Sequence, residues 1–482
     1  MTHVYDGGAF QMSTLPRSLV LALALFSAAS APVSTASAQT PSRATNRLAF
    51  LHASVIPMDK ERVLRDYTVV VANGKIVDIG ASAAVKVPSD AVRIDATGRY
   101  LIPALSDMHV HLLCEAWKIV LPPDAQPAIK DLPFESLLFP YVAMGVTTVQ
   151  ALSATPEEVT LRGRINRGEL IGPRLILARM IDGPKMAWPP PLSTWVATPA
   201  EAREGVRQAK AAGYDKIKVY SFLTRESYDA IVTTARELGM DVIGHVPNAI
   251  SVEYTLDAGQ RNIVHSEEVM KQAHGNYTAA RIDSFADLMA RRGVWMTPTL
   301  VTNRNILEIF DAPDNLPVNP EDVYFRHPLE TGVWSFLVEQ RYKPIPEEMR
   351  KKLRDGFTNF QQPLTKAFRD KGGRLLAGSD TPVPRLVPGF ALHRELRELV
   401  EAGLTPYEAL RTSTTNPFEY LGESDKAGTI GVGKQTDLLL VDANPLEDIT
   451  AAAKISGVLM RGRWLDKAEI GRKMQAISAL PK

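Results

Sequence analysis

Eight short apolar segments separated by helical stretches restrict the fold of this chain more than any other feature of its sequence. Two of the helical stretches, residues 198–213 and 224–239, are amphipathic, and each is expected to begin with a capping box at a threonine. This alternation is typical of βα units around a parallel sheet, and eight units are the number that closes a (β/α)8 TIM barrel, an α/β fold. An open doubly wound sheet is the alternative, but it would need a glycine-rich phosphate-binding turn that these segments lack. The eight segments are residues 101–111, 145–152, 173–181, 215–220, 241–246, 262–267, 293–300 and 373–380.

The two ends of the chain differ in pattern from the expected barrel region at 101–424. Residues 45–100 contain short β-rich runs, two of them around Asn73-Gly74, a dipeptide typical of a hairpin turn. Residues 425–482 return to β character after the last barrel helix. We expect these two parts to pair and form one small β-sandwich domain built from both ends of the chain.

Residues 1–38 have the pattern of a secretory signal peptide. Arg17 gives a positive start, residues 18–31 are apolar, and the small residues "ASA" at 36–38 suit a cleavage site. The apolar run is too short to span a membrane. The sequence therefore predicts an exported protein, periplasmic or secreted, whose mature form has no membrane contact.

Charge and cysteine content exclude several classes of function. The chain has 55 Lys and Arg against 54 Asp and Glu, so its net charge of +1 offers no bulk attraction to nucleic acid or to an anionic membrane. Its one cysteine, Cys114, rules out a disulfide framework and is expected to be a buried packing residue. We expect a small-molecule substrate as the partner, and a homo-oligomer stays open.

The segment "SDMHVHLL" places His109 and His111 one residue apart inside an apolar run. Alternate residues of a strand point to the same face, so both imidazoles would aim at one point, as metal ligands do. Two structural histidines at the end of a strand are the alternative. Further polar residues end other predicted strands, and in a barrel these ends form the active face. They are Lys218, His245, His265 and Asp380.

This constellation resembles the amidohydrolase superfamily over residues 48–467. The resemblance implies two divalent metal ions, with zinc as the expected metal, and a carboxylated Lys218 that bridges them. Lys216 is the competing lysine, because it shares a strand face with Lys218. One departure is Ala104, where the family usually has glycine, which affects only the local turn. The metal ligands carried over from the family are His109, His111, Lys218, His245, His265 and Asp380.

The segments "IKVY", "GHVP" and "GSDTP" are most similar to the branch with imidazolonepropionase-like proteins and Xaa-Pro dipeptidases. That branch implies hydrolysis of an amide or peptide C–N bond by a metal-activated hydroxide, in a dipeptide such as Xaa-Pro, an N-acyl amino acid or a related small amide. Asp380 would move the proton, and Tyr220 could donate a hydrogen bond to the developing oxyanion. A lactonase or esterase using the same site is the alternative. A deaminase fits less well, because such family members usually lack the lysine, and a non-enzymatic relative would have lost ligands.

Other residues complete the expected pocket. Residues 302–371 are too long for a plain connection, and we expect them to form a cap over the metals. The proline-rich stretch 186–195 is expected to form an apolar wall. Arg304 and Tyr324 are candidates for contacting a substrate carboxylate, and His393 is expected to make a structural contact.

Overall fold

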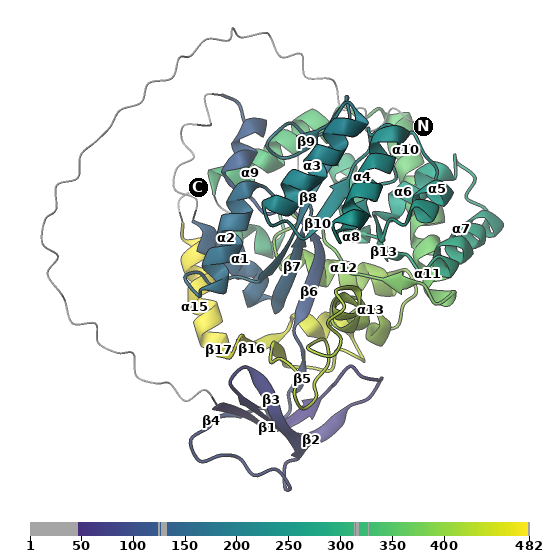
Figure 1. The fold of residues 1–482 in the computed structure, drawn as a ribbon. Helices are drawn as coiled ribbons and strands as arrows, with labels where there is room; N and C mark the ends of the chain where they lie inside the picture. The colour runs from purple at the N-terminus through teal and green to yellow at the C-terminus, as the bar shows by residue number, and fades with distance from the viewer. Residues whose placement is uncertain are drawn as a thin grey trace, which may run out of the picture.

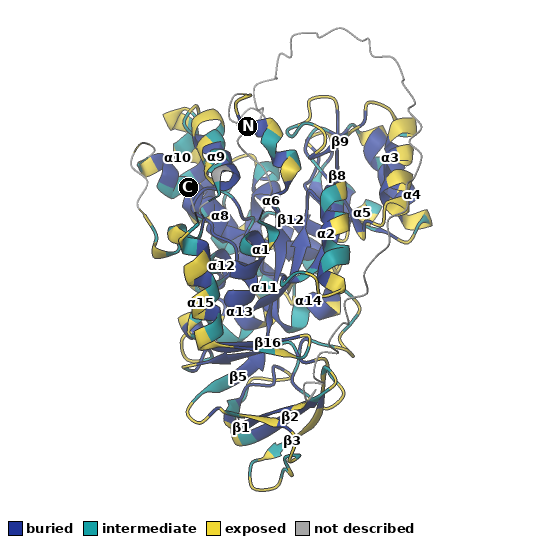
Figure 2. Ribbon diagram, turned by 90° about the vertical axis from the view of Figure 1, so that its left-hand side faces the viewer, coloured by how far each residue is buried: buried dark blue, intermediate teal, exposed yellow. Residues whose placement is uncertain are grey.

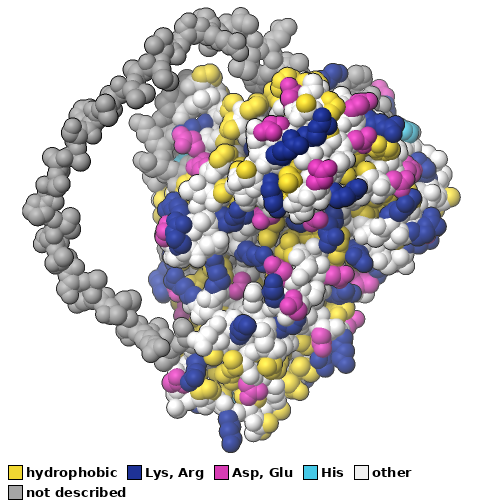
Figure 3. All heavy atoms as spheres, viewed as in Figure 1, with side chains coloured by type: hydrophobic (Ala, Val, Ile, Leu, Met, Phe, Trp, Pro, Cys, Tyr) yellow, Lys and Arg dark blue, Asp and Glu magenta, His cyan; other side chains and the backbone are white. Residues whose placement is uncertain are grey.

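The computed structural model describes residues 47–123, 126, 133–312, 314, 318–325 and 327–480. The predicted signal peptide lies outside these residues. Figure 1 shows a barrel ringed by helices, with a smaller strand-rich sheet below it. Buried residues fill the strands and the inner helix faces, whereas exposed residues lie on the outer faces (Figure 2). The face in Figure 3 carries intermixed basic and acidic side chains, as the balanced charge predicts.

The upper body is a barrel of eight parallel strands, which confirms the predicted fold class. The strands are β6 (Leu105–Val110), β7 (Val146–Ala151), β8 (Arg174–Asp182), β10 (Lys216–Val219), β11 (Asp241–Gly244), β12 (Asn262–Val264), β13 (Trp295–Thr297) and β14 (Arg374–Leu375), in this order around the sheet. The short β9 (Thr194–Trp195) adds to β8. Hydrogen bonds from the backbone N–H of Met108 to Ala377 O (2.9 Å) and from that of His111 to Thr381 O (2.7 Å) close the barrel between β6 and the segment after β14.

Helices cover the barrel because each turns an apolar face to the strands. α3 (Pro199–Ala211) buries Ala202 and Val206 and begins with the predicted capping box at Thr198. At α4 (Arg225–Glu237) that prediction is wrong: the third helical residue is Ser227 and not Glu, so Thr224 caps the helix without a reciprocal bond. The other helices around the barrel are α1 (Phe134–Ala143), α2 (Pro156–Asn166), α5 (Val252–Ala258), α6 (Ser266–Gln272), α7 (Ala279–Arg291), α12 (Phe390–Glu401), α13 (Pro406–Ser413) and α14 (Thr415–Tyr420).

The lower body is one eight-stranded sheet made from both ends of the chain, as predicted for the small domain. Its order is β17-β16-β15-β5-β1-β2-β3, with β4 paired to β1. β15 pairs with β5 and so joins the two ends, and the Asn73-Gly74 turn joins β2 and β3 with both residues at positive φ. Phe50 and Trp464 meet edge to face in its small core. The strands are β1 (Arg47–Val55), β2 (Leu64–Ala72), β3 (Lys75–Ala81), β4 (Val92–Asp95), β5 (Tyr100–Pro103), β15 (Leu438–Val441), β16 (Ile455–Met460) and β17 (Arg463–Asp466), followed by α15 (Lys467–Ser478).

The stretch after β13 divides into two parts. Its first part reaches over the carboxyl ends of the strands, where α9 and η4 supply side chains to a central cavity. Its last helix, α11, instead packs beside α7 in the outer ring. The elements are α8 (Leu300–Asp311), η3 (Pro320–Tyr324), α9 (Pro328–Phe336), the π-helical η4 (Leu337–Tyr342), α10 (Glu347–Gly356), the π-helical η5 (Phe357–Gln361) and α11 (Gln362–Asp370). Within the described part of the chain, no helix has the length and apolar character that a membrane span needs.

Candidate active site

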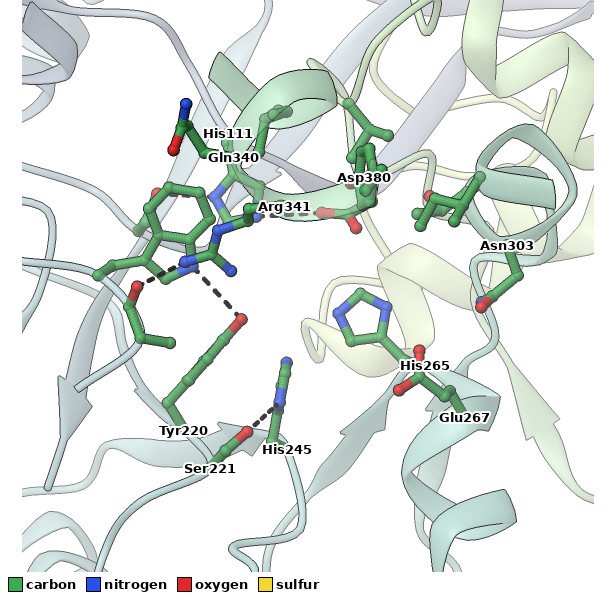
Figure 4. Close-up of a pocket in the computed structure, with 18 of the residues that line it drawn as sticks. His111, Tyr220, Ser221, His245, His265, Glu267, Asn303, Gln340, Arg341 and Asp380 are labelled. Carbon is green, nitrogen blue, oxygen red and sulfur yellow. Dashed lines mark hydrogen bonds and ion pairs between the residues drawn. The ribbon is translucent and has the colours of Figure 1, made fainter. Parts of the chain in front are cut away.

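The carboxyl ends of the barrel strands bring the predicted site residues together. His109 Nε2 and His111 Nε2 each lie 3.1 Å from the same oxygen of Asp380, and 3.3 Å from one another. The donor atoms of His109, His265 and Asp380 all lie within 4.8 Å of one another. The ring of His265 is centred 5.0 Å from that of His245, which continues the cluster. All four histidines are therefore on one face of the barrel, and Figure 4 shows three of them with Asp380 around a common space.

Hydrogen bonds hold three of these imidazoles with Nε2 directed to the centre. His111 Nδ1 lies 2.6 Å from Ser153 Oγ, and His265 Nδ1 lies 2.7 Å from Thr299 Oγ1. His245 Nδ1 lies 3.0 Å from Ser221 Oγ and 3.1 Å from a carboxylate oxygen of Glu268. His245 Nε2 is buried without a hydrogen-bond partner among the described residues. Tethered Nδ1 atoms and an unpartnered Nε2 are the arrangement that metal-binding histidines adopt, so these residues fit a metal ion.

Burial sets the charge of the cluster. It lowers the pKa of His109 to about 3 and that of His245 to about 4, so both imidazoles are neutral near pH 7 and keep a free lone pair. Burial opposes ionisation of Asp380, but the neighbouring histidines outweigh it and hold the pKa of this carboxyl well below its usual value. Neutral imidazoles with one carboxylate are a donor set that zinc accepts.

The two candidate lysines have different surroundings. Lys218 is fully buried at the cavity, and its ammonium makes no ion pair or hydrogen bond with the described residues. Burial lowers the pKa of Lys218 to about 8, which raises the fraction of nucleophilic neutral amine. Lys216 lies away from the cavity, where its Nζ is 2.5 Å from Asp241 and 4.5 Å from the ring centre of Tyr420. Lys218 is therefore the lysine that is free to react.

A cavity of about 400 Å³ lies above the cluster, within the range of small-molecule sites. Tyr220 lines it and packs against His245 with ring centres 3.9 Å apart and ring planes tilted by 31°. Burial raises the pKa of Tyr220 to about 12, so its hydroxyl stays protonated as a donor. Trp117 and Trp188 form an apolar wall, with ring centres 5.5 Å apart. Trp188 belongs to the stretch in which the sequence predicted such a wall.

The two residues that the sequence offered for contacting a substrate carboxylate are not among the described residues that line the cavity, whereas a cationic residue that lines it was missed. Arg304 Nε lies 3.1 Å from Glu398, and neither Arg304 nor Tyr324, which stacks on Phe390, is among the described cavity-lining residues. Arg341 lines the cavity instead. Its position in η4 gives no signal in the sequence, because it depends on how the cap folds back.

Other residues act by holding the site in shape. Buried Asp107 accepts hydrogen bonds from the backbone N–H (3.0 Å) and hydroxyl (2.6 Å) of Ser379 and so ties β6 to the segment after β14. Its place two residues before His109 on the same strand face was the available signal. A Cβ at Gly378 would lie 2.7 Å from that of His109, so glycine is needed for this close approach.

The predicted structural contacts are present. His393 Nε2 lies 2.9 Å from Met144 O, away from the cavity. Cys114 is free and buried. Ala104 is buried and has no positive φ, so the missing glycine does not strain the turn. His265 and Asp380 do adopt positive φ angles, 73° and 54°, a strained conformation that clusters at functional sites.

A comparison of the chain with known families agrees with this geometry. The sequence model of the amidohydrolase family matches residues 100–465, well over half of the chain. The chain belongs to the amidohydrolase family. Amidohydrolases are metal-dependent hydrolases that act on carbon–nitrogen bonds, and the cluster of neutral histidines at the barrel mouth is the part of this chain that fits such chemistry.

Individual relatives are more distant. A stretch of 106 residues is 35% identical to an adenine deaminase of Deinococcus deserti, covering 20% of this chain and 19% of that protein. A stretch of 105 residues is 31% identical to an imidazolonepropionase of Mycolicibacterium smegmatis, covering 22% and 24%. These matches span about a fifth to a quarter of the curated relatives. A solved Xaa-Pro dipeptidase with methionine in its active site shares the fold, with a TM-score of 0.67, 22% identity, and coverage of 87% of this chain and 100% of that one.

Proposed function

We propose that this amidohydrolase is an exported enzyme that uses two divalent metal ions to hydrolyse an amide or peptide C–N bond in a small substrate. A dipeptide such as Xaa-Pro, an N-acyl amino acid or a related amide fits the proposal. The observation that carries it is the convergence of four neutral histidines and Asp380 beside an unpaired, buried Lys218. The export step is supported by the sequence pattern of residues 1–38 alone.

The proposed ligand set follows the resemblance to the amidohydrolase family. His109, His111 and Asp380 would hold one ion, and His245 and His265 the other. Carboxylation of the Lys218 amine would turn a cationic side chain into an anion able to bridge both ions. Bound ions would supply an ionised water near neutral pH and polarise the substrate carbonyl.

The side chains of the site would carry the remaining steps. Asp380 is ionised and lies beside the ligand nitrogens, so it can accept a proton from the attacking water and pass it to the leaving nitrogen. The protonated Tyr220 hydroxyl in the cavity wall can stabilise the oxyanion that forms at the carbonyl. The apolar wall of Trp117 and Trp188 would exclude bulk water from the reacting atoms.

Hydrolysis of a lactone or ester at the same site is the second candidate, because the same attack on a carbonyl applies to an oxygen leaving group. Deamination has the support of a short match to an adenine deaminase. It fits Lys218 less well, because a single-metal deaminase has no use for a bridging anion.

Metal analysis of the purified mature protein, followed by a substrate panel, tests the proposal. We expect two equivalents of divalent metal per chain and turnover of dipeptides or N-acyl amino acids in preference to lactones and adenine. The Asp380→Asn variant should lose about 100- to 10,000-fold in kcat, the range of a general acid–base residue. A metal-replete protein that turns over only lactones, or only adenine, would favour the corresponding alternative.

A further inference from the structure

Arg341 is a cationic residue of the cavity wall that the proposed hydrolysis does not use. Among the described residues that line the cavity, three carry a cationic group. Lys218 belongs to the metal cluster, and Lys271 forms ion pairs with Glu267 (3.1 Å) and Glu268 (2.7 Å). Arg341 makes no ion pair with any described residue. Its charge therefore has no anionic partner within the described part of the chain.

The guanidinium of Arg341 is nevertheless held firmly. It stacks on the ring of Trp188 at 4.1 Å, and its Nη2 donates a hydrogen bond to Ala187 O at 2.6 Å. Ala187 in turn donates its backbone N–H to the buried carboxylate of Asp182 at 2.9 Å. A guanidinium has five N–H donors, so one hydrogen bond leaves most of the planar fork for a ligand. The residue is thus pre-organised on a rigid platform.

The charged side chains around the cavity determine which way a substrate with a carboxylate would lie. Figure 4 shows Arg341 near Tyr220 and His111, whereas Glu267 lies beside His265. A carboxylate near Glu267 would meet like charge, whereas a carboxylate beside Arg341 would meet the unpaired cation. A dipeptide placed with its carboxyl end at Arg341 would carry its amide bond across the space between.

We propose that Arg341 binds the free carboxylate of the amino acid that leaves on hydrolysis, and so restricts the enzyme to substrates with an α-carboxylate on the scissile nitrogen's side. This proposal rests on the proposed amide hydrolysis. It selects dipeptides and N-acyl amino acids over lactones and neutral amides. The apolar side chains of Trp117, Val333 and Leu337 in the same cavity suit an apolar amino-acid side chain. A neutral ligand would remove water from the guanidinium without replacing it by an ion pair. The resulting loss of binding free energy discriminates strongly against neutral ligands.

A structural role is the competing explanation. Arg341 joins the cap to the loop after β8 through Trp188 and Ala187, so the guanidinium could serve only to hold these two segments together. A purely structural contact would affect the affinity for all ligands equally, whereas a carboxylate-binding residue raises the affinity only of ligands with a carboxylate. Paired acid and amide ligands separate the two roles.

Binding of N-methylsulfonyl-L-leucine and of N-methylsulfonyl-L-leucinamide to the metal-replete full chain provides the test, because a sulfonamide in place of the acyl group resists the proposed hydrolysis. Isothermal titration calorimetry should show the acid binding at least about 30-fold tighter than the amide, as expected for a desolvated charge pair. Arg341→Met, which keeps an apolar side chain over Trp188, should remove most of this difference and leave the affinity for the amide within about threefold. Arg341→Lys should keep only part of the difference between acid and amide, because an ammonium cannot donate the two parallel hydrogen bonds that a planar guanidinium offers a carboxylate.

The matched control is Lys343→Met, which removes a cation two residues away in the cap. Lys343 pairs with Glu339 at 2.6 Å and is not among the described cavity-lining residues. This variant should keep the full preference for the acid. Equal binding of acid and amide by the parent protein, or equal losses for both in Arg341→Met with unchanged metal content, would overturn the proposal.

Kinetics distinguish failure of this proposal from failure of the proposed function. L-Leu-L-Pro and L-Leu-L-Met are compared with their C-terminal amides, and Arg341→Met should raise KM for the free acids much more than it lowers kcat. If no amide bond is cleaved while the Arg341-dependent preference for the acid persists in calorimetry, the proposed reaction is wrong and the carboxylate site stands. If peptides and their amides are cleaved equally well, the reaction stands and the carboxylate site is wrong.

Discussion

At the scale of single residues, Lys218 and Lys216 share a strand and a face but differ in what surrounds them. Lys218→Ala should remove the bridging group, so we expect metal content to fall and activity to drop by more than the roughly 10- to 100-fold that loss of an outer partner costs. Metal analysis and kcat/KM measure both effects, and short carboxylic acids added to the variant should restore part of the activity. Lys216→Met should keep its metal, because Lys216 pairs with Asp241 away from the cavity. The opposite pattern would mean that Lys216 is the bridging lysine.

Ser153 is a residue that acts through a ligand. Its hydroxyl lies 2.6 Å from His111 Nδ1 and orients that ring toward Asp380. We expect Ser153→Ala to weaken metal affinity by about 10- to 100-fold, as removal of such partners generally does. Competition with a fluorescent chelator measures this affinity. Ser153→Thr, which keeps the hydroxyl, serves as the control, and unchanged affinity in Ser153→Ala would show that His111 does not need its partner.

The sequence predicted the cluster at the barrel mouth better than it predicted the cavity wall above it. His245 and His265 could be found because each directly follows a strand, and Asp380 because it ends the apolar segment that begins with β14. Parallel strands bring their carboxyl ends together. Arg341 could not, because its position over Trp188 depends on a contact between residues far apart in the chain. Arg304 was expected at the cavity but pairs with Glu398 outside it, and no sequence pattern revealed this ion pair.

At the scale of elements, the sequence likewise predicted the barrel strands better than the path of the cap. All eight strands matched apolar runs, because burial inside a barrel demands them. The π-helical turns η4 and η5 have no comparable signal. The place of α11 beside α7 likewise depends on how the chain leaves the cap and returns to the outer ring.

The cap element η4 leads to a prediction about selectivity. Leu337 lines the cavity, so Leu337→Ala should enlarge it and shift the ratio of kcat/KM between a large and a small substrate side chain by about tenfold, as pocket methylenes do. Leu329→Ala is the matched control. Leu329 is fully buried in the neighbouring α9 but is not among the described cavity-lining residues, so its truncation should destabilise the cap without changing the ratio. If both variants gave the same ratio, η4 would contribute packing and not substrate selectivity. The metal content should stay constant in both variants.

At the scale of the whole molecule, the metal cluster and the stability of the fold are coupled through protonation. The pKa of His109 is lowered to about 3 and that of His245 to about 4, from an ordinary value near 6.5. Without metal, these two histidines therefore bind more protons in the unfolded chain than in the folded chain between about pH 6.5 and pH 3. Their contribution to stability is fully present above pH 6.5 and is lost as pH falls through this window. Bound metal adds stability to the folded state alone, by about 4 kcal/mol when its free concentration is 1,000 times Kd.

Thermal unfolding with and without a chelator measures this coupling. We expect removal of metal at pH 7.5 to lower Tm by several degrees, and zinc to restore it. Acidification to pH 5 should lower Tm of the metal-free protein further, and added zinc should rescue it less well there, because protons compete for the same nitrogens. His393 provides the control, since burial lowers its pKa to about 4 although it lies away from the cavity. His393→Gln should reduce the acid sensitivity of both forms alike, whereas the difference between the forms should persist because it arises at the cluster. Identical Tm values with and without chelator at pH 7.5 would mean that the histidines do not bind metal in the folded protein.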